Sequence, residues 1–148
     1  MEHSAYLALG SNLGDRMVNL AQALVLINAD AAIQCCSRVF ETPPWGYLDQ
    51  PPFYNMVIEV VTGLTPLELL RNLKRIEKEM GRQESVRYGP RLIDLDILFY
   101  DEIELHTPQL DIPHPRIAER AFVLAPLADL AADRTVPPGG QTVAWLLA

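Results

Sequence analysis

Residues 53–81 read FYNMVIEVVTGLTPLELLRNLKRIEKEMG, and this stretch decides the fold. Its first nine residues are rich in β-branched and aromatic side chains, which is typical of a strand. Thr65-Pro66-Leu67-Glu68 is a capping box with proline at the first helical position, so a helix is expected to begin there. Gly81 is expected to end that helix, whose apolar residues recur at helical spacing: Leu69, Leu73, Ile76 and Met80. The stretch therefore predicts a strand followed by an amphipathic helix.

An earlier part of the chain predicts the same order of a strand followed by a helix, and then a further strand. The unit at residues 53–81 is likewise followed by a further strand. Residues 6–9 predict a buried strand, Asp15 is placed to cap a helix with apolar residues at i, i+4 and i+7, and residues 33–41 predict a second strand. After Gly81, residues 92–100 predict a fourth strand. Two strand–helix–strand units predict an α+β fold with a ferredoxin-like split βαβ core. We expect an antiparallel sheet with helices on one face and an open ligand face opposite.

Length and composition indicate one ordinary domain. The chain has 148 residues, 49% hydrophobic and 21% charged, so we expect a single domain over 1–148 and exclude a disordered chain or a fibre. Cys35 and Cys36 are adjacent, a spacing that does not suit zinc, and are expected to be small apolar residues in a strand. Neither a secretory signal nor a membrane-length apolar run is visible. We therefore expect a cytoplasmic protein without a membrane partner.

The charge is unevenly distributed. Twelve basic and nineteen acidic residues give a net charge of −7, the wrong sign for a general nucleic-acid binder. Residues 71–91 nevertheless contain seven basic and three acidic residues, a local charge of +4. Such a strip favours a small anionic ligand. The alternative is a solvated helix face with pairs such as Arg75–Glu79. This alternative accounts well for the basic residues within the helix, but less well for Arg82, Arg87 and Arg91, which follow it.

The sharpest chemical signal is the alternation in residues 92–99, LIDLDILF. In a strand, one side carries a core face of Ile93, Leu95, Ile97 and Phe99. Asp94 and Asp96 then share the other side, about 6.6–7 Å apart, and such oxygen ligands suit Mg²⁺. A solvated strand face is the alternative. The preceding Arg91 favours a phosphoryl-transfer site, which requires carboxylates for metal beside arginines for phosphate.

Other candidates are less specific. Residues 10–14, GSNLG, follow a strand and open a helix, so they suit either an anion-binding turn or an ordinary tight turn. Phe53 and Phe122 are aromatic residues in or beside loops, and they suit either a ligand or a core. The carboxamide of Asn55 can match the amide edge of a flat heterocycle. His114, between two prolines, is expected in a rigid exposed loop that contacts phosphate.

Residues 87–98, RYGPRLIDLDIL, resemble the signature of the 6-hydroxymethyl-7,8-dihydropterin pyrophosphokinase family, also called 2-amino-4-hydroxy-6-hydroxymethyldihydropteridine diphosphokinases. Further matching blocks follow the family order at 9–14, 42–46, 53–55, 75–77, 80–82, 113–116 and 119–122. The resemblance implies a ferredoxin-like core and two Mg²⁺ ions bound with ATP. We expect the protein to be a monomer. It also implies transfer of diphosphate from ATP to the hydroxymethyl group of the pterin, with release of AMP, in folate biosynthesis.

The resemblance also implies site residues. The implied metal ligands are Asp94 and Asp96, and the implied catalytic residues are Arg82 and Arg91. The implied pterin-binding residues are Gly10, Thr42, Pro43, Pro44, Trp45, Phe53, Asn55 and Phe122. The implied nucleotide-binding residues are Glu77, Arg87, Tyr88, Ile97, His114 and Arg120. One departure is Glu84, which stands where some members carry a second arginine.

Two other classes of protein are consistent with parts of the pattern. A ferredoxin-like regulatory module would bind a small ligand without catalysis, but it needs neither paired aspartates on the open face nor arginines beside them. A Mg²⁺-dependent phosphohydrolase needs both, but it does not need aromatic residues beside Asn55. These features favour the pyrophosphokinase.

Overall fold

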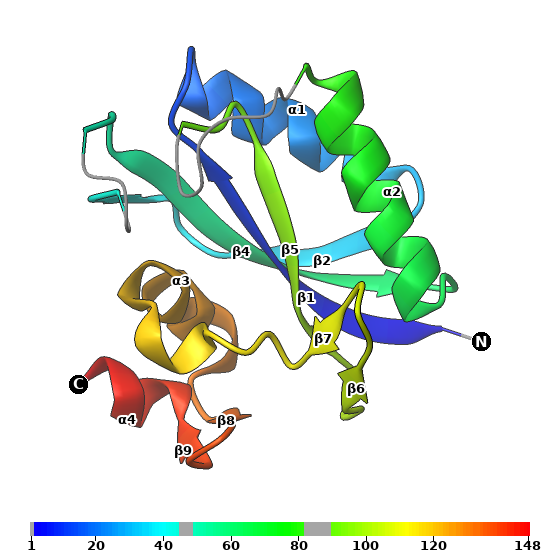
Figure 1. Ribbon diagram of the computed structural model, residues 1–148, viewed down its shortest axis with the longest axis vertical. Helices are drawn as coiled ribbons and strands as arrows, with labels where there is room; N and C mark the ends of the chain where they lie inside the picture. Colours follow the sequence, from blue (N-terminus) through cyan, green and yellow to red (C-terminus); the bar gives the residue numbers. More distant parts are fainter. Residues whose placement is uncertain (1, 45–48, 82–89) are drawn as a thin grey trace.

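The computed structural model describes residues 2–44, 49–81 and 90–148. Its main sheet has the strand order β2-β4-β1-β5, with β3 also pairing with β4, and every pairing is antiparallel (Figure 1). The elements up to this sheet's last strand are β1 (His3–Ser11), α1 (Arg16–Asn28), β2 (Ala32–Cys36), β3 (Phe40–Thr42), β4 (Phe53–Thr62), α2 (Pro66–Glu79) and β5 (Asp94–Tyr100). This architecture confirms the predicted α+β fold class.

The rest of the chain forms short elements beside and beneath this sheet. They are β6 (Leu105–His106), β7 (Asp111–Ile112), a 3-10 helix (Ile117–Glu119), α3 (Ala121–Ala131), β8 (Thr135–Val136), β9 (Gln141–Thr142) and α4 (Val143–Leu147). The strands form two small antiparallel pairs, β6 with β7 and β8 with β9. In the described part of the chain, no helix is both long and apolar enough to cross a membrane.

The predicted helix starts are confirmed by their hydrogen bonds. The Thr65 hydroxyl accepts from Glu68 N at 3.3 Å, and the Glu68 carboxylate accepts from Thr65 N at 2.9 Å, which completes the capping box of α2. Asp15 caps α1 by accepting from Val18 N at 3.1 Å. Because each cap satisfies an otherwise unpaired backbone N–H, it fixes where its helix begins.

The strand predicted at 33–41 is interrupted. Ser37 N donates to the Val57 carbonyl at 2.8 Å, and the Ser37 hydroxyl accepts from Val57 N at 2.9 Å. A side chain thus replaces one main-chain partner, and the predicted strand becomes β2 and β3, which pair with different parts of β4. After the break, β3 places Thr42 opposite Phe53.

The expected burial of Cys35 and Cys36 is wrong. Both residues lie in a strand as predicted, but both are exposed. Successive residues of a strand point to opposite faces, so the exposure of both shows that neither face of the edge strand β2 is covered there.

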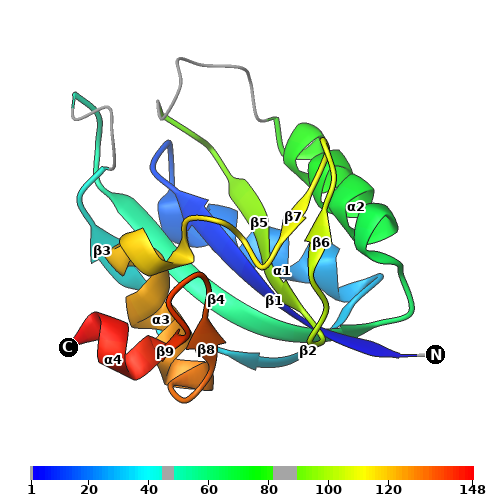
Figure 2. The same ribbon diagram turned by 60° about the horizontal axis from the view of Figure 1, so that its bottom comes forward.

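The helices cover the two faces of the sheet unequally. α1 and α2 cover one face, where the core includes Leu7, Leu9, Leu20, Ile27, Ile58, Leu69, Leu73 and Ile76. α3 packs against part of the other face, with Val57, Leu98, Phe99, Val123 and Leu127 in a second core (Figures 1 and 2). The open face expected from the sequence is therefore narrower than the whole sheet.

Phe99 does not share a face with Ile93, Leu95 and Ile97, contrary to expectation. The β1–β5 register pairs Tyr6 with Phe99 but Leu7 with Ile97, so β5 carries an extra residue there. This bulge breaks the alternation and turns Phe99 into the core beneath α3, where its ring meets Tyr6 edge-on at 6.1 Å.

Candidate active site

A cavity of about 250 Å³ lies on the open part of the sheet. Its walls come from β1, β4, β5 and α3, from the segments that lead into β5 and α3, and from Thr42 at the end of β3 with the following Pro43. The predicted site residues that line it are Gly10, Thr42, Pro43, Phe53, Asn55, Arg91, Asp94, Asp96, His114, Arg120 and Phe122. Residues from six separate sequence blocks thus meet around one cavity.

The two aspartates of β5 face this cavity together. Leu95, between them, is fully buried on the opposite side, so the alternation predicted from the sequence holds here. Burial, together with the nearby Asp94 and Glu77 carboxylates, raises the pKa of Asp96 to about 7. The cations of Lys74 and Arg120 oppose that rise. The pair therefore places two half-buried carboxylates that repel each other in the cavity wall.

This pair fits a magnesium ion bound with phosphate. Within residues 2–44, 49–81 and 90–148, no group of three or more His, Cys, Asp or Glu side chains is arranged to hold a metal. Two carboxylates alone leave most coordination positions to water and ligand oxygens. Mg²⁺ is commonly held in this way, by one or two carboxylates together with substrate phosphates.

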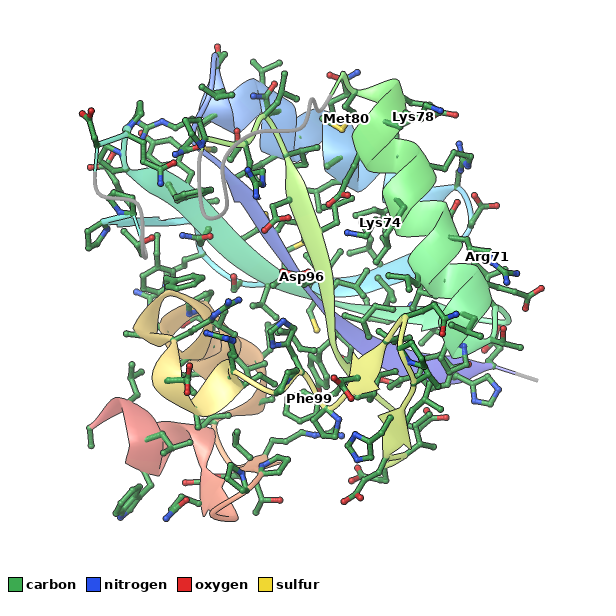
Figure 3. The ribbon with its side chains drawn as sticks, viewed as in Figure 1. Arg71, Lys74, Lys78, Met80, Asp96 and Phe99 are labelled. Atoms are coloured by element: carbon green, nitrogen blue, oxygen red, sulfur yellow. The ribbon has the colours of Figure 1, made fainter. Side chains whose placement is uncertain are left out.

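Glu77 supports the aspartates from behind the strand. It lies on α2 and is 3% exposed, and its Oε2 accepts from Leu95 N at 2.8 Å. Its Oε1 lies 3.3 Å from Lys74 Nζ, and Figure 3 shows Lys74 on the part of α2 that lies nearest β5 and Asp96. Because Leu95 belongs to an edge strand, Glu77 supplies the hydrogen-bond acceptor that a further strand would supply.

His114 is half-buried in the cavity wall, whereas an exposed loop was expected. Its backbone N donates to the Leu98 carbonyl at 3.0 Å, which docks this segment onto β5. Burial, together with the cations of Arg120 and Arg116, lowers the pKa of His114 to about 4. Its Nδ1 accepts from Arg116 N at 3.2 Å, so the neutral ring carries its hydrogen on Nε2.

Another part of the cavity wall combines aromatic rings with an amide. Phe53 comes from β4 and Phe122 from α3. Asn55 is 8% exposed, and its Nδ2 donates to the Thr42 hydroxyl at 2.5 Å. Gly10 faces Asn55 across the β1–β4 ladder, where a side chain would collide with the amide. This wall can therefore hold a flat ring with polar atoms at its edge.

The remaining predicted residues fall into two groups. Trp45, Arg82, Arg87 and Tyr88 lie outside the described residues, as does Glu84. Among the described ones, Pro44, Glu77 and Ile97 are not in the cavity lining. Ile97 is 3% exposed and packs in the core beneath the helices, because it alternates with the aspartates.

Some lining residues were missed by the sequence analysis: Ala8, Leu9, Met56, Leu98 and Val123. Ala8 could have been found, because it lies two residues before Gly10 on the same strand and thus on the same face. Leu98 could have been found in the same way, because it lies two residues after Asp96 on β5 and thus on the same face. Asn12 was also missed, because the GSNLG stretch was interpreted only as a turn.

Fold and cavity together define a ferredoxin-like α+β protein in which one pocket joins paired carboxylates, cationic side chains and aromatic rings. The family model for 7,8-dihydro-6-hydroxymethylpterin-pyrophosphokinase (HPPK) matches residues 6–132, and the chain belongs to this family.

Individual relatives agree with this assignment. A Bacillus subtilis 2-amino-4-hydroxy-6-hydroxymethyldihydropteridine pyrophosphokinase is 50% identical over 132 residues, which are 88% of this chain and 79% of that protein. A protein of the same name from Methylorubrum extorquens is 43% identical over 97% of this chain and 91% of its own length. An Arabidopsis thaliana folate synthesis bifunctional protein is 53% identical, but the match spans only 29% of it.

Solved structures support the fold. A crystal structure of a Plasmodium falciparum HPPK-DHPS triple mutant with pteroate superimposes on 99% of this chain with a TM-score of 0.77, at 19% identity. Another HPPK-DHPS structure, in complex with substrates, gives a TM-score of 0.79 at 18% identity. In each case the match covers 43% of the larger chain.

Proposed function

We propose that this protein transfers a diphosphoryl group from ATP to the hydroxymethyl group of 6-hydroxymethyl-7,8-dihydropterin, releasing AMP, as a step of folate biosynthesis. Membership of the family supports the reaction. The single observation that carries it for this chain is the composition of the cavity, which combines two carboxylates and three basic side chains with an aromatic and amide wall. A phosphohydrolase would not need that wall, and a regulatory module would not need the paired aspartates.

The aromatic and amide wall is suited to the pterin. Phe53 and Phe122 offer ring faces to a flat heterocycle, and stacking on aromatic rings favours such a ligand. One Asn55 N–H is directed to Thr42, which fixes the amide orientation. The Asn55 carbonyl and its other N–H then face the edge of the ring, where they can pair with an amide-like donor and acceptor.

The charged part of the cavity wall is suited to the triphosphate. Arg91 and Arg120 are permanently charged, and His114 presents an uncharged Nε2–H donor. Asp94 and Asp96 would hold magnesium, which when bound neutralises phosphate oxygens and lowers the cost of bringing an alcohol to them. The arginines add positive charge where negative charge develops during transfer.

The reaction then needs little more than positioning. The pterin hydroxymethyl oxygen forms a bond to the β-phosphorus, and the bond between that phosphorus and the oxygen bridging to the α-phosphorus breaks. The bonding electrons leave with AMP, and the hydroxyl proton is released. Arg82, predicted to act in this step, lies outside the described residues.

Product analysis tests this function. The purified protein is mixed with ATP, Mg²⁺ and the hydroxymethyl-dihydropterin, and the reaction is repeated without each component. We expect pterin diphosphate only when all components are present. Hydrolysis of ATP at the same rate without the pterin would instead support the phosphohydrolase.

A further inference from the structure

Asn12 joins two segments that each lead to residues of the cavity wall. It follows β1 in the turn toward α1, and it is 1% exposed. It makes four hydrogen bonds, two to Arg91 and two to the segment that precedes β4. It does not line the cavity itself, so any effect on the reaction has to act through these neighbours.

On one side, Asn12 fixes the backbone of Arg91. Asn12 N donates to the Arg91 carbonyl at 3.0 Å, and Arg91 N donates to the Asn12 Oδ1 at 2.7 Å. The side-chain oxygen thus takes the place of a backbone carbonyl. This arrangement continues the β1–β5 pairing beyond Gly10 and Asp94. It also sets the position from which the Arg91 side chain reaches the part of the cavity that we propose binds the triphosphate.

On the other side, Asn12 fixes the start of β4. Its Nδ2 donates to Gln50 Oε1 at 2.7 Å and to the Pro51 carbonyl at 3.0 Å. These residues lead directly to Phe53, which belongs to the aromatic and amide wall of the cavity. The same segment has a second anchor, because Arg16 donates to the Pro52 carbonyl at 2.9 Å and stacks on the Tyr54 ring at 3.7 Å.

We propose that Asn12 is a positioning residue that couples binding of the nucleotide to binding of the pterin. The inference rests on the proposed function. A buried carboxamide that donates to one segment and accepts from the other loses hydrogen bonds if either segment moves, and buried polar groups without partners are costly. A nucleotide that orders Arg91 therefore also orders Asn12 and the entry to β4. The pterin then binds to a wall that is already in place, and linkage makes the effect reciprocal.

Calorimetry tests the coupling directly. The dissociation constant of the pterin is measured with and without a non-hydrolysable ATP analogue and Mg²⁺, and the ratio of the two is the coupling factor. For the wild type we expect a factor within the usual range of about 5–150. In Asn12→Ala the factor should approach unity, although each ligand still binds alone. A merely structural defect would weaken the binding of both ligands and leave the coupling factor unchanged.

Two further variants keep the test decisive. Arg16→Ala is the matched control. It removes the hydrogen bond that holds the same segment at Pro52, and none of the hydrogen bonds between Asn12 and Arg91 is changed. This variant should retain the wild-type coupling factor. Gln50→Ala removes one hydrogen-bond partner of Asn12 and leaves Asn12 itself intact. It should therefore lower the coupling factor less than Asn12→Ala does. If Asn12→Ala does not fold, the coupling factor of Gln50→Ala tests the inference instead. A wild-type factor of unity, or a wild-type factor in both Asn12→Ala and Gln50→Ala, overturns the inference. AMP formation by the wild type is scored separately, so the proposed function can stand when this inference fails.

Discussion

Asn55 lies directly across Gly10. The two residues are partners in the β1–β4 ladder, and a Cβ atom built on Gly10 would lie 2.7 Å from the Asn55 Oδ1 and 3.4 Å from the Phe53 ring. No real Cβ contact is as short as the first of these. The absence of a side chain at position 10 therefore makes room for the amide that we assign to the pterin edge.

Gly10→Ala should weaken pterin binding without unfolding the protein. The added methyl group meets the end of a flexible side chain, so Asn55 moves and its bond to Thr42 is lost or distorted. Losing well-placed polar contacts of this kind costs about 1–3 kcal/mol, or roughly 5–150-fold in affinity. Calorimetry with the pterin measures the loss, and nucleotide affinity is the internal control. Unchanged pterin affinity would show that Asn55 is not at the pterin edge.

Asp94→Asn and Asp96→Asn should each abolish measurable turnover while preserving the fold. Each change removes a charge that we propose binds the metal but keeps the side-chain shape. Stability without metal should be equal or higher, because one of two neighbouring carboxylates that repel each other in a buried site has been neutralised. Thermal unfolding and product analysis measure the two effects, and chelation of Mg²⁺ from the wild type should reproduce the loss of turnover. A variant that unfolds, or one that stays active, would give these residues a structural role only.

His114 should remain uncharged well below neutral pH. Its folded-state pKa is lowered to about 4 from an ordinary value of 6.5, so between these values the unfolded chain binds a proton that the folded protein does not. The His114 contribution to stability is therefore lost as the pH falls from about 6.5 toward 4, and His114→Gln should lose less stability than the wild type over this window. The imidazole NMR signals offer a direct check: they should not titrate between pH 7 and 5. A midpoint near 6.5 contradicts the burial seen here.

Glu77 should matter as an acceptor more than as a charge. Glu77→Ala leaves the Leu95 N–H buried without its partner, which should destabilise the protein by about 1–3 kcal/mol. Glu77→Gln keeps a side-chain oxygen at the same place and should recover most of that stability. Chemical denaturation of the two variants compares them. If the glutamine variant is as unstable as the alanine variant, the carboxylate charge is what holds β5.

Patterns carried by neighbouring residues were predictable from the sequence. The capping box of α2, the Asp15 cap of α1 and the alternation around Asp94 and Asp96 each depend on local spacing, and the structure confirms all three. The resemblance to the family added distant blocks, such as that around Phe122, which no local rule could have placed in the same cavity.

The missed features depend on contacts between distant residues. The bulge that turns Phe99 away from Ile97 arises from pairing with β1, and the break at Ser37 arises from pairing with β4. Cys35 is exposed because neither face of the edge strand β2 is covered there. The contacts of Asn12 join two segments that lie far from it in sequence.

The position of the bond cleaved in ATP tests the central claim most directly. The protein is incubated with Mg²⁺, the hydroxymethyl-dihydropterin and ATP labelled at the β-phosphorus, and the products are separated. Transfer of a diphosphoryl group predicts that the label appears in the pterin product in equal amount to the AMP formed. Label retained in ADP, or released as free phosphate or diphosphate, would contradict the function proposed for this cavity.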